Sequence, residues 1–355
     1  MPAKKTDRSG YKKLKKDLLD NTIGSLYIFH GEETYLRDFY LEQLRKKIIP
    51  PGMGDFNDHR IDGKSATVQA ISELVNALPM MSERTLVSVI DFDLFSAPEA
   101  ERNALVTLLS DLPAYCCLVF IYDIQTFKSD ARMKKLSAVI RDHGVIVSFA
   151  QQESSDLIAW IRRRFRALDH DISSADAEYL IFLCGDLMNG LISEIEKIGA
   201  YAKATIISRA DIDAVAIPQP DAVVFQMTDA LTAQNFDQAA AILGDLLQMQ
   251  QAPIMIIAVL GKQLRQLLTA RLLLDAGQGS HDLMELWGMR VSYPAERLMN
   301  AARRFSYEWC AMAVRRCAQT DVTLKSVSGV DGRDLLVNLL LELADLGGKK
   351  YATYS

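Results

Sequence analysis

The sequence predicts a mixed α/β domain in the first 150 residues and helical structure in the rest of the chain. Up to Ala150, short apolar runs rich in β-branched residues alternate with helical patterns. This alternation is typical of a parallel sheet that is covered by helices on both faces. Beyond Ala150 the strand-like runs stop, and apolar residues recur at helical spacing. The 355 residues, 49% of them hydrophobic, suffice for two or three domains.

The period of the apolar residues predicts four strands and four helices in the first domain. The strands are expected at 26–30, 85–90, 117–122 and 145–149, and the helices within 36–48, 68–75, 104–109 and 134–140. The segment PPGMGDFND (50–58) is expected to be a loop, because prolines and glycines favour turns.

Three domains are expected along the chain. The α/β domain covers 1–150, a small helical domain covers 151–216, and a helical C-terminal domain covers 217–355. The best candidate linker contains Pro218 and Pro220, because proline interrupts both helices and strands.

The charge is unevenly distributed, with a net value of −5 and a basic N-terminus. Residues 1–16 contain one acid and seven basic residues: Lys4, Lys5, Arg8, Lys12, Lys13, Lys15 and Lys16. This segment could contact nucleic acid, but a solvated helix face is the favoured interpretation. The acidic remainder argues against a stand-alone DNA-binding protein. No apolar run approaches the ~18 residues of a membrane span and no signal-peptide core follows the basic start, so a cytoplasmic protein is expected.

No catalytic or metal-binding constellation is predicted. The five histidines are scattered, so zinc is not expected, and the five cysteines show no metal-type spacing. Cys117 lies in an apolar run, where an inert core thiol is a better interpretation than a nucleophile. The acid pairs Asp55 and Asp58, and Asp211 and Asp213, are explained by solvation and by helix ends. The chain is therefore expected to have no catalytic residue, cofactor or metal.

The first strand and helix enclose a turn where a nucleotide-binding protein would carry its phosphate loop. Such a loop needs a second glycine, a lysine and a hydroxyl residue in the pattern GxxxxGK[ST]. The turn here reads Gly31-Glu32-Glu33-Thr34, and its two carboxylates would repel a triphosphate. Asp91 and Asp93 follow the second strand, as a metal-binding acid would, but this is a weak motif without the lysine. We therefore expect no nucleotide hydrolysis.

The turn before the strand at 85–90 is unusually apolar. Leu78, Pro79, Met80 and Met81 continue the apolar run past the end of the preceding helix. Two adjacent methionines in a tight turn cannot both point into one core, so at least one should be exposed. An exposed apolar turn could dock into a pocket on a partner. Packing of both methionines under the next loop is the equally weighted alternative.

These segments, taken together, resemble the delta subunit of the bacterial DNA polymerase III clamp loader. In the first domain the resemblance lies in LYIFHGEETYL (26–36), DFNDHRIDG (55–63) and ALPMMSERTLVSV (77–89). It continues through GDLMNGLISEIEKIGAYA (185–202), VVFQMTDAL (223–231), APIMIIAVLGKQLRQLL (252–268), ARRFSYEWCAMAV (302–314) and DVTLKSVSGVDGRDLLVNLLLEL (321–343). Each motif is weak alone, but their shared order over nearly the whole chain is specific.

The resemblance implies an AAA+-like first domain that does not hydrolyse ATP, a helical lid and a helical collar. It implies binding to the ring-shaped β sliding clamp, opening of the ring and its loading onto primed DNA. The clamp-binding residues would be Leu78, Met80 and Met81. The partners would be the ATPase subunits and delta-prime, held through the collar, with primed DNA inside the assembled loader. Ser82 is expected to act as a turn hydroxyl, and Arg84 to form a local ion pair.

Two alternatives remain. An active AAA+ ATPase would need the missing GK[ST] loop, and a non-catalytic DNA-binding or assembly scaffold would need a basic face beyond residues 1–16. Arg162, Arg163, Arg164 and Arg166 form one basic cluster, but consecutive arginines point around a helix rather than along a stripe. A polymerase or nucleotidyltransferase label would come only from membership of the holoenzyme, since no polymerase site is expected.

Overall fold

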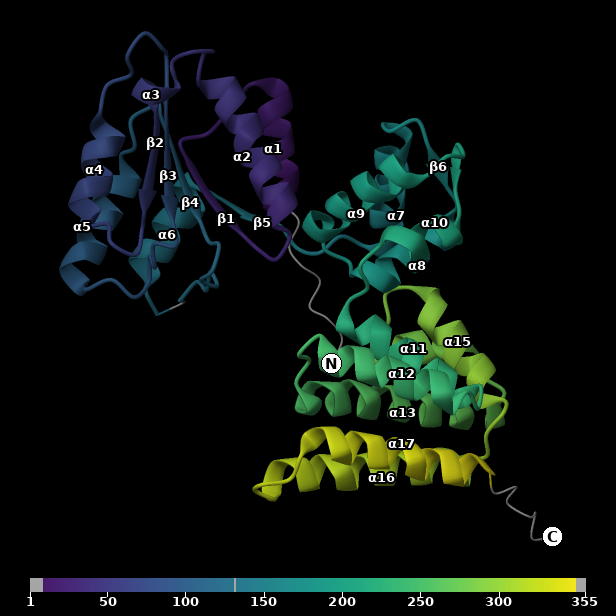
Figure 1. The fold of residues 1–355 in the computed structure, drawn as a ribbon. Coiled ribbons are helices and arrows are strands. Elements are labelled where there is room, and N and C mark those ends of the chain that lie inside the picture. The colour runs from purple at the N-terminus through teal and green to yellow at the C-terminus, as the bar shows by residue number, and fades with distance from the viewer. Residues whose placement is uncertain (1–8, 131, 349–355) are drawn as a thin grey trace. The chain divides into compact units, whose positions relative to one another are not determined.

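The structure, a computed structural model, describes residues 9–130 and 132–348 (Figure 1). The chain forms two compact units, of which unit 1 extends to residue 152 and includes 187–189. Unit 2 comprises 153–186 and the residues from 190 onward. The division of the helical part into separate domains at residue 216 stays a prediction.

Unit 1 is built on a five-stranded parallel sheet of order β2-β3-β4-β1-β5. The strands are β1 (Leu26–His30), β2 (Asp58–Asp62), β3 (Thr85–Ile90), β4 (Cys116–Ile121) and β5 (Val145–Ser148). The four expected strands are present within a residue of their predicted ends, and each pairs in parallel. The expected parallel sheet is therefore confirmed.

Helices cover both faces of this sheet (Figure 1). They are α1 (Ser9–Asp20), α2 (Thr34–Ile48), α3 (Gly54–Asn57), α4 (Val68–Asn76), α5 (Glu99–Ser110) and α6 (Lys134–His143). Successive residues of a strand point to opposite faces. Leu26 and Ile28 of β1 accordingly belong to the core under α4, α5 and α6, whereas Tyr27 and Phe29 belong to the core under α1 and α2.

The prediction of a loop at residues 50–58 is partly wrong. Residues 54–57 form the short helix α3, and Asp58 begins β2. β2 is an edge strand, and its side chains are at least partly exposed. It therefore has no continuous apolar run from which the sequence could predict a strand. Its pairing with β3, which sets Asp58 beside Leu86, makes it a strand.

Unit 2 is almost entirely helical. Its helices are α7 (Ser154–Arg166), α8 (Ser174–Cys184), α9 (Met188–Tyr201), whose first two residues belong to unit 1, α10 (Arg209–Val215), α11 (Pro220–Thr232), α12 (Phe236–Gln248), α13 (Pro253–Asp275), α14 (Ser280–Trp287), α15 (Ser292–Ala302), α16 (Tyr307–Ser326) and α17 (Gly332–Gly348). Pro220 is the first residue of α11, where its missing N–H costs no helical hydrogen bond.

Strands do not stop entirely after Ala150, contrary to the prediction. Asp171–Ile172 (β6) and Ile206–Ile207 (β7) form a two-stranded parallel sheet. Each strand has two residues, too short for a period of two to be recognised in the sequence.

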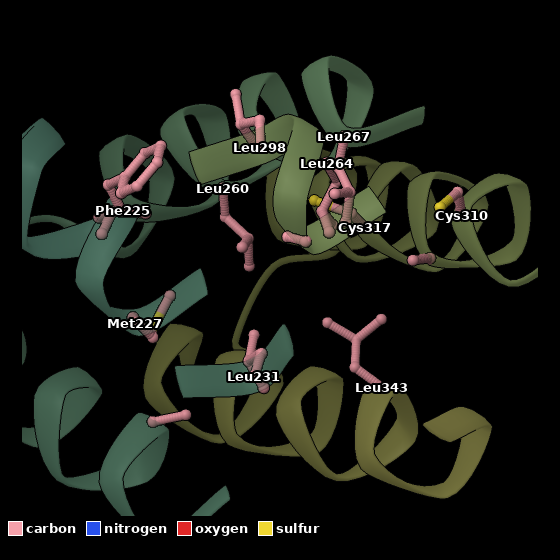
Figure 2. Packing of buried hydrophobic residues seen from close by; sticks show 14 of the residues in the cluster. Phe225, Met227, Leu231, Leu260, Leu264, Leu267, Leu298, Cys310, Cys317 and Leu343 are labelled. Atoms are coloured by element: carbon pink, nitrogen blue, oxygen red, sulfur yellow. The ribbon is translucent and has the colours of Figure 1, made fainter. Parts of the chain in front are cut away.

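The core of unit 2 extends along α13 (Figure 2). Leu260, Leu264 and Leu267 of this helix are buried together with Leu298 of α15 and Cys317 of α16. In the part of the chain that is described, no helix is both long and apolar enough to cross a membrane.

Candidate protein-docking site

The apolar turn predicted as a docking feature is exposed at one edge of the sheet in unit 1. It lies between the end of α4 and the start of β3, and so at the edge where the parallel strands begin. Leu78, Met80 and Met81 are 74%, 55% and 84% exposed. The alternative in which both methionines pack under the next loop is therefore wrong. We call residues 77–84 the docking loop.

The end of α4 explains why the apolar run leaves the core. Val68, Ile71 and Val75 bury one face of α4 against the sheet. Ala77, the residue after the last residue of α4, has extended backbone (φ −65°, ψ 126°). Because α4 ends at Asn76, the helical spacing that places Val68, Ile71 and Val75 in the core does not continue to Leu78.

Asn57, the last residue of α3, holds the docking loop in place. The side-chain oxygen of Asn57 accepts from the backbone N–H of Met80, and its amide group donates to the carbonyl of Met80, each at 2.8 Å. The same amide donates to the carbonyl of Met53 at 3.1 Å, and Asn57 is fully buried. No pattern in the sequence indicates a role for this residue, because only the fold brings it to a loop 23 positions away.

Ser82 and Arg84 fix the other end of the docking loop. Ser82 acts as the expected turn hydroxyl, since its Oγ donates to the carbonyl of Arg84 at 3.0 Å. The prediction that Arg84 forms a local ion pair is wrong. Its guanidinium donates to the backbone carbonyls of Ile23 at 2.8 Å and Gly24 at 3.0 Å, because the turn before β1 lies beside the docking loop.

Met81 adopts a left-handed backbone conformation with φ of 53°. This region is uncommon for residues other than glycine and is strained for bulky side chains. The hydrogen bonds at Met80 and Arg84 lie on both sides of Met81 and hold it in this conformation. The loop thus presents its apolar side chains on a preorganised backbone.

The opposite edge of the sheet contains the turn that corresponds to a phosphate loop. Gly31 has φ of 121°, and a Cβ there would lie 2.4 Å from the carbonyl oxygen of Phe149. The N–H of Glu33 donates to that same oxygen at 2.9 Å, and the side chain of Glu33 is buried. A phosphate at the start of α2 would need free backbone N–H groups and space. Here the N–H of Glu33 is bonded to Phe149, and Phe149 lies against Gly31.

Asp91, the candidate metal-binding acid, binds backbone groups instead. Its carboxylate accepts from the N–H groups of Asp123 at 2.8 Å, Ile124 at 3.1 Å and Gln125 at 3.1 Å. Burial alone would raise the pKa of Asp91, but these hydrogen bonds and Lys64 at 3.7 Å outweigh it and lower the pKa. Asp91 thus fastens the loop after β4 to the end of β3.

Three of the other acids considered in the sequence, Asp58, Asp211 and Asp213, also have structural partners. Asp58 forms an ion pair with Arg45, and Asp213 accepts from the hydroxyl of Tyr179 at 2.5 Å. Asp211 closes a capping box with Ser208 at the start of α10. Within 9–130 and 132–348, no group of three or more His, Cys, Asp or Glu residues could hold a metal ion.

All five cysteines are buried free thiols, as expected. Burial raises the pKa of Cys117 to about 12, so its reactive thiolate form is scarce at neutral pH. This agrees with an inert core thiol and not with a nucleophile.

The basic segments behave as solvated surfaces where they can be seen. Residues 1–8 lie outside the described part of the chain. In α1, Leu14 and Leu18 are buried and the four lysines 12, 13, 15 and 16 are exposed. On α7, Arg162 and Arg166 lie within 3.6 Å of Asp171. The helix-face interpretation is therefore supported for the described part of the N-terminal segment.

Comparison with known families matches this chain twice, in both cases to one family. The family model described as "DNA polymerase III, delta subunit" matches residues 27–149. The family model described as "DNA polymerase III delta subunit, C-terminal domain" matches residues 221–342. The first match contains the docking loop, and the second covers most of α11 to α17.

Individual relatives agree over most of the chain. DNA polymerase III subunit delta of Bacillus subtilis is 23% identical over 334 residues, which are 92% of this chain and 94% of the relative. The probable DNA polymerase III subunit delta of Aquifex aeolicus is 22% identical over 275 residues, 76% of this chain and 77% of the relative. The solved structure of the Bacillus subtilis DNA clamp loader delta protein has the same fold, with a TM-score of 0.53 at 21% identity over 94% of this chain and 99% of that chain.

The fold and the site define a class of protein: a parallel-sheet α/β domain without a GxxxxGK[ST] phosphate-loop motif, followed by a helical part. The chain belongs to the DNA polymerase III delta subunit family. This membership gives it a role in DNA replication as part of a clamp loader.

Proposed function

We propose that this chain binds the β sliding clamp through the docking loop and opens the ring for loading onto primed DNA. The observation that carries the proposal is the exposure of Leu78, Met80 and Met81 on a loop that Asn57 and Arg84 hold in one conformation. A few desolvated apolar anchors dominate the energy of most protein interfaces, at about 2 kcal/mol or more each. A preorganised loop also loses less conformational entropy on binding.

Ring opening needs no bond chemistry in this chain. A ligand shifts an equilibrium between two states only by its different affinity for them. A subunit that binds the open clamp interface more tightly than the closed one would therefore hold the ring open. The rigid docking loop suits this task, because it would fit one curvature of the clamp surface better than the other.

ATP hydrolysis would belong to the sister subunits. The turn Gly31–Thr34 lacks the residues that bind a triphosphate, and its buried Glu33 places an acid where phosphate would lie. We propose that the ATPase subunits and delta-prime contact this chain through the collar, residues 217–355. Exposed apolar residues on its last two helices, such as Val322 and Leu341, support an interface there. The loader would act in the cytoplasm, where bacterial DNA is replicated.

Calorimetric titration of the full chain with its sliding clamp, without nucleotide, tests the proposal. We expect the wild type to bind and the Met80→Ala/Met81→Ala variant to bind at least about 100-fold more weakly. A Leu19→Ala/Ile124→Ala variant is the matched control, because it removes two strongly exposed apolar side chains elsewhere in unit 1. This control should bind as the wild type does.

Two results would contradict the proposal. Absence of wild-type binding would leave a non-catalytic AAA+-like scaffold that does not act on a clamp. Undiminished binding by the methionine variant would keep the clamp as partner but would move the contact away from the docking loop.

A further inference from the structure

Phe56 is an exposed aromatic side chain beside the docking loop. It belongs to α3, and 53% of its surface is accessible, whereas its neighbour Asn57 is fully buried. Burial of an apolar ring is favourable, so leaving the ring of Phe56 half in water forgoes much of the stabilisation that it could supply. Exposed aromatic residues beside other apolar groups are typical of binding surfaces.

The backbone places Phe56 at the same edge of the sheet as the docking loop. Asn57 pairs both of its amide atoms with the backbone of Met80, so Phe56 is the residue next to this contact. Asp58 lies beside Leu86 in the sheet, and the two strands are parallel. The chain before Asp58 and the chain before Leu86 therefore reach this edge together, one with Phe56 and the other with the docking loop.

We propose that Phe56 is a further contact residue for the clamp, so that the docking surface consists of two segments rather than one. This inference rests on the function proposed for the docking loop. Leu78, Met80 and Met81 supply flexible apolar side chains, whereas Phe56 supplies a rigid ring with only two rotatable bonds. Aromatic residues of this kind are over-represented among the residues that dominate binding energy.

The charges around the two segments define the chemistry of the complementary surface. Asp55 precedes Phe56 and Glu83 lies within the docking loop, and both acids are exposed. The one cation of the docking loop, Arg84, donates to backbone carbonyls of Ile23 and Gly24. The surface that receives these segments should therefore be an apolar pocket with a basic rim, and association should slow as salt increases.

Titration of the full chain with the sliding clamp tests the role of Phe56. We expect Phe56→Ala to weaken binding about 10-fold or more and Phe56→Leu, which keeps an apolar side chain, to weaken it less. Phe39→Ala is the matched control, because Phe39 is 45% exposed on α2 of the same unit. Circular dichroism of each variant checks that the fold is retained.

The outcomes separate this inference from the function on which it rests. If the wild type binds, Met80→Ala/Met81→Ala does not, and Phe56→Ala binds as the wild type does, the contact role of Phe56 is wrong while the proposed function stands. Equal weakening by Phe39→Ala and Phe56→Ala would also overturn it. If the wild type itself does not bind the clamp, the proposed function fails first.

Discussion

At the scale of single residues, Asn57 links two segments that are distant in the chain. Its buried amide uses both donor and acceptor atoms on the backbone of Met80 and adds a bond to Met53. Removal of one partner from a buried hydrogen bond costs about 1–3 kcal/mol, because the other group stays unsatisfied. The conformation of the docking loop should thus depend on a residue that itself cannot touch a partner.

We expect Asn57→Ala to weaken clamp binding about 5- to 30-fold, since the docking loop must then be ordered during binding at a cost of about 1–2 kcal/mol. Calorimetric titration of the folded variant measures the effect. Asn103→Ala, which changes an exposed asparagine on α5, is the control and should bind normally. Unchanged affinity in Asn57→Ala would show that the loop needs no such support.

Asp91 is a second single residue with a structural role, and its contribution depends on pH. Its pKa in the folded chain is lowered, chiefly by backbone hydrogen bonds from Asp123, Gln125 and Ile124 that outweigh the effect of burial. A lowered pKa means that the stabilisation is present above the unfolded value of about 3.9. It is lost as the pH falls through the folded value, when the carboxylate takes up a proton.

We expect Asp91→Asn to increase deuterium uptake at residues 123–125 at pH 7. The difference from the wild type should shrink only as the pH falls through the lowered folded pKa of Asp91, below its ordinary value of 3.8, because the wild-type carboxylate then becomes protonated as well. Hydrogen exchange with mass spectrometry, with both proteins compared at each pH, measures this. Asp93→Asn is the control, because Asp93 binds the N–H groups of Phe95 and Ser96 instead. Equal deuterium uptake by Asp91→Asn and the wild type at residues 123–125 at pH 7 would contradict the assigned role.

At the scale of elements, α13 organises the core of unit 2. This helix has 23 residues, and buried positions occur on several of its sides, including Leu260, Gln263 and Leu264. Gln263 is satisfied inside the core, since its Oε1 accepts from the hydroxyl of Thr228 at 2.6 Å. A helix buried in this way is stabilised mainly by its neighbours and not by its own helix propensity.

We expect Leu264→Ala to destabilise unit 2 by about 2–5 kcal/mol, because it leaves a cavity in a packed core. All three tryptophans of the chain, Trp160, Trp287 and Trp309, lie in unit 2, so denaturant unfolding followed by their fluorescence reports on this unit. Leu272→Ala changes an exposed leucine of the same helix and should cost less than about 1 kcal/mol. Similar costs for the two variants would mean that α13 is not packed as described.

Contacts between α8, α10 and α15 explain why residues on both sides of Pro220 share one compact unit. Arg209 stacks on the ring of Tyr179 at 4.3 Å and faces Tyr293 at 5.1 Å. Glu178 accepts from both the N–H and the hydroxyl of Ser292. Such contacts would make the expected lid and α15 of the proposed collar move together.

At the scale of the whole molecule, the proposed docking loop and the turn that corresponds to a phosphate loop lie at opposite ends of the strands in unit 1. The docking loop lies where the strands begin, and the degenerate phosphate turn lies where they end. In the proposed function, the parallel-sheet fold would thus serve as a scaffold for a protein contact.

We expect the isolated chain to bind no ATP and its affinity for the clamp to be the same with and without Mg-ATP. The acidic, closed turn at Gly31–Thr34 offers no site for a triphosphate. Calorimetric titration with Mg-ATP, and clamp titration in its presence, measure both effects. ATP binding or turnover by the pure chain would contradict the division of labour between this chain and its sister subunits.

The sequence by itself determined the parallel sheet, the change to helical structure after Ala150, the absence of a phosphate-loop motif and the apolar turn at Leu78, Met80 and Met81. These features depend on local periods, on turn residues and on residue types at fixed spacing, all of which can be read along the chain. The family resemblance, which the comparisons confirm, rested on the same local motifs.

Only the tertiary structure decided that the apolar turn is exposed and how it is held. Asn57 meets Met80 across 23 positions, and Arg84 meets Ile23 across 61, because neighbouring parallel strands bring their starting points to one edge of the sheet. The sequence did not predict β2, because this edge strand depends on its pairing with β3 and has no continuous apolar run. Contacts between distant residues leave no period in the sequence, and the docking loop is built from such contacts.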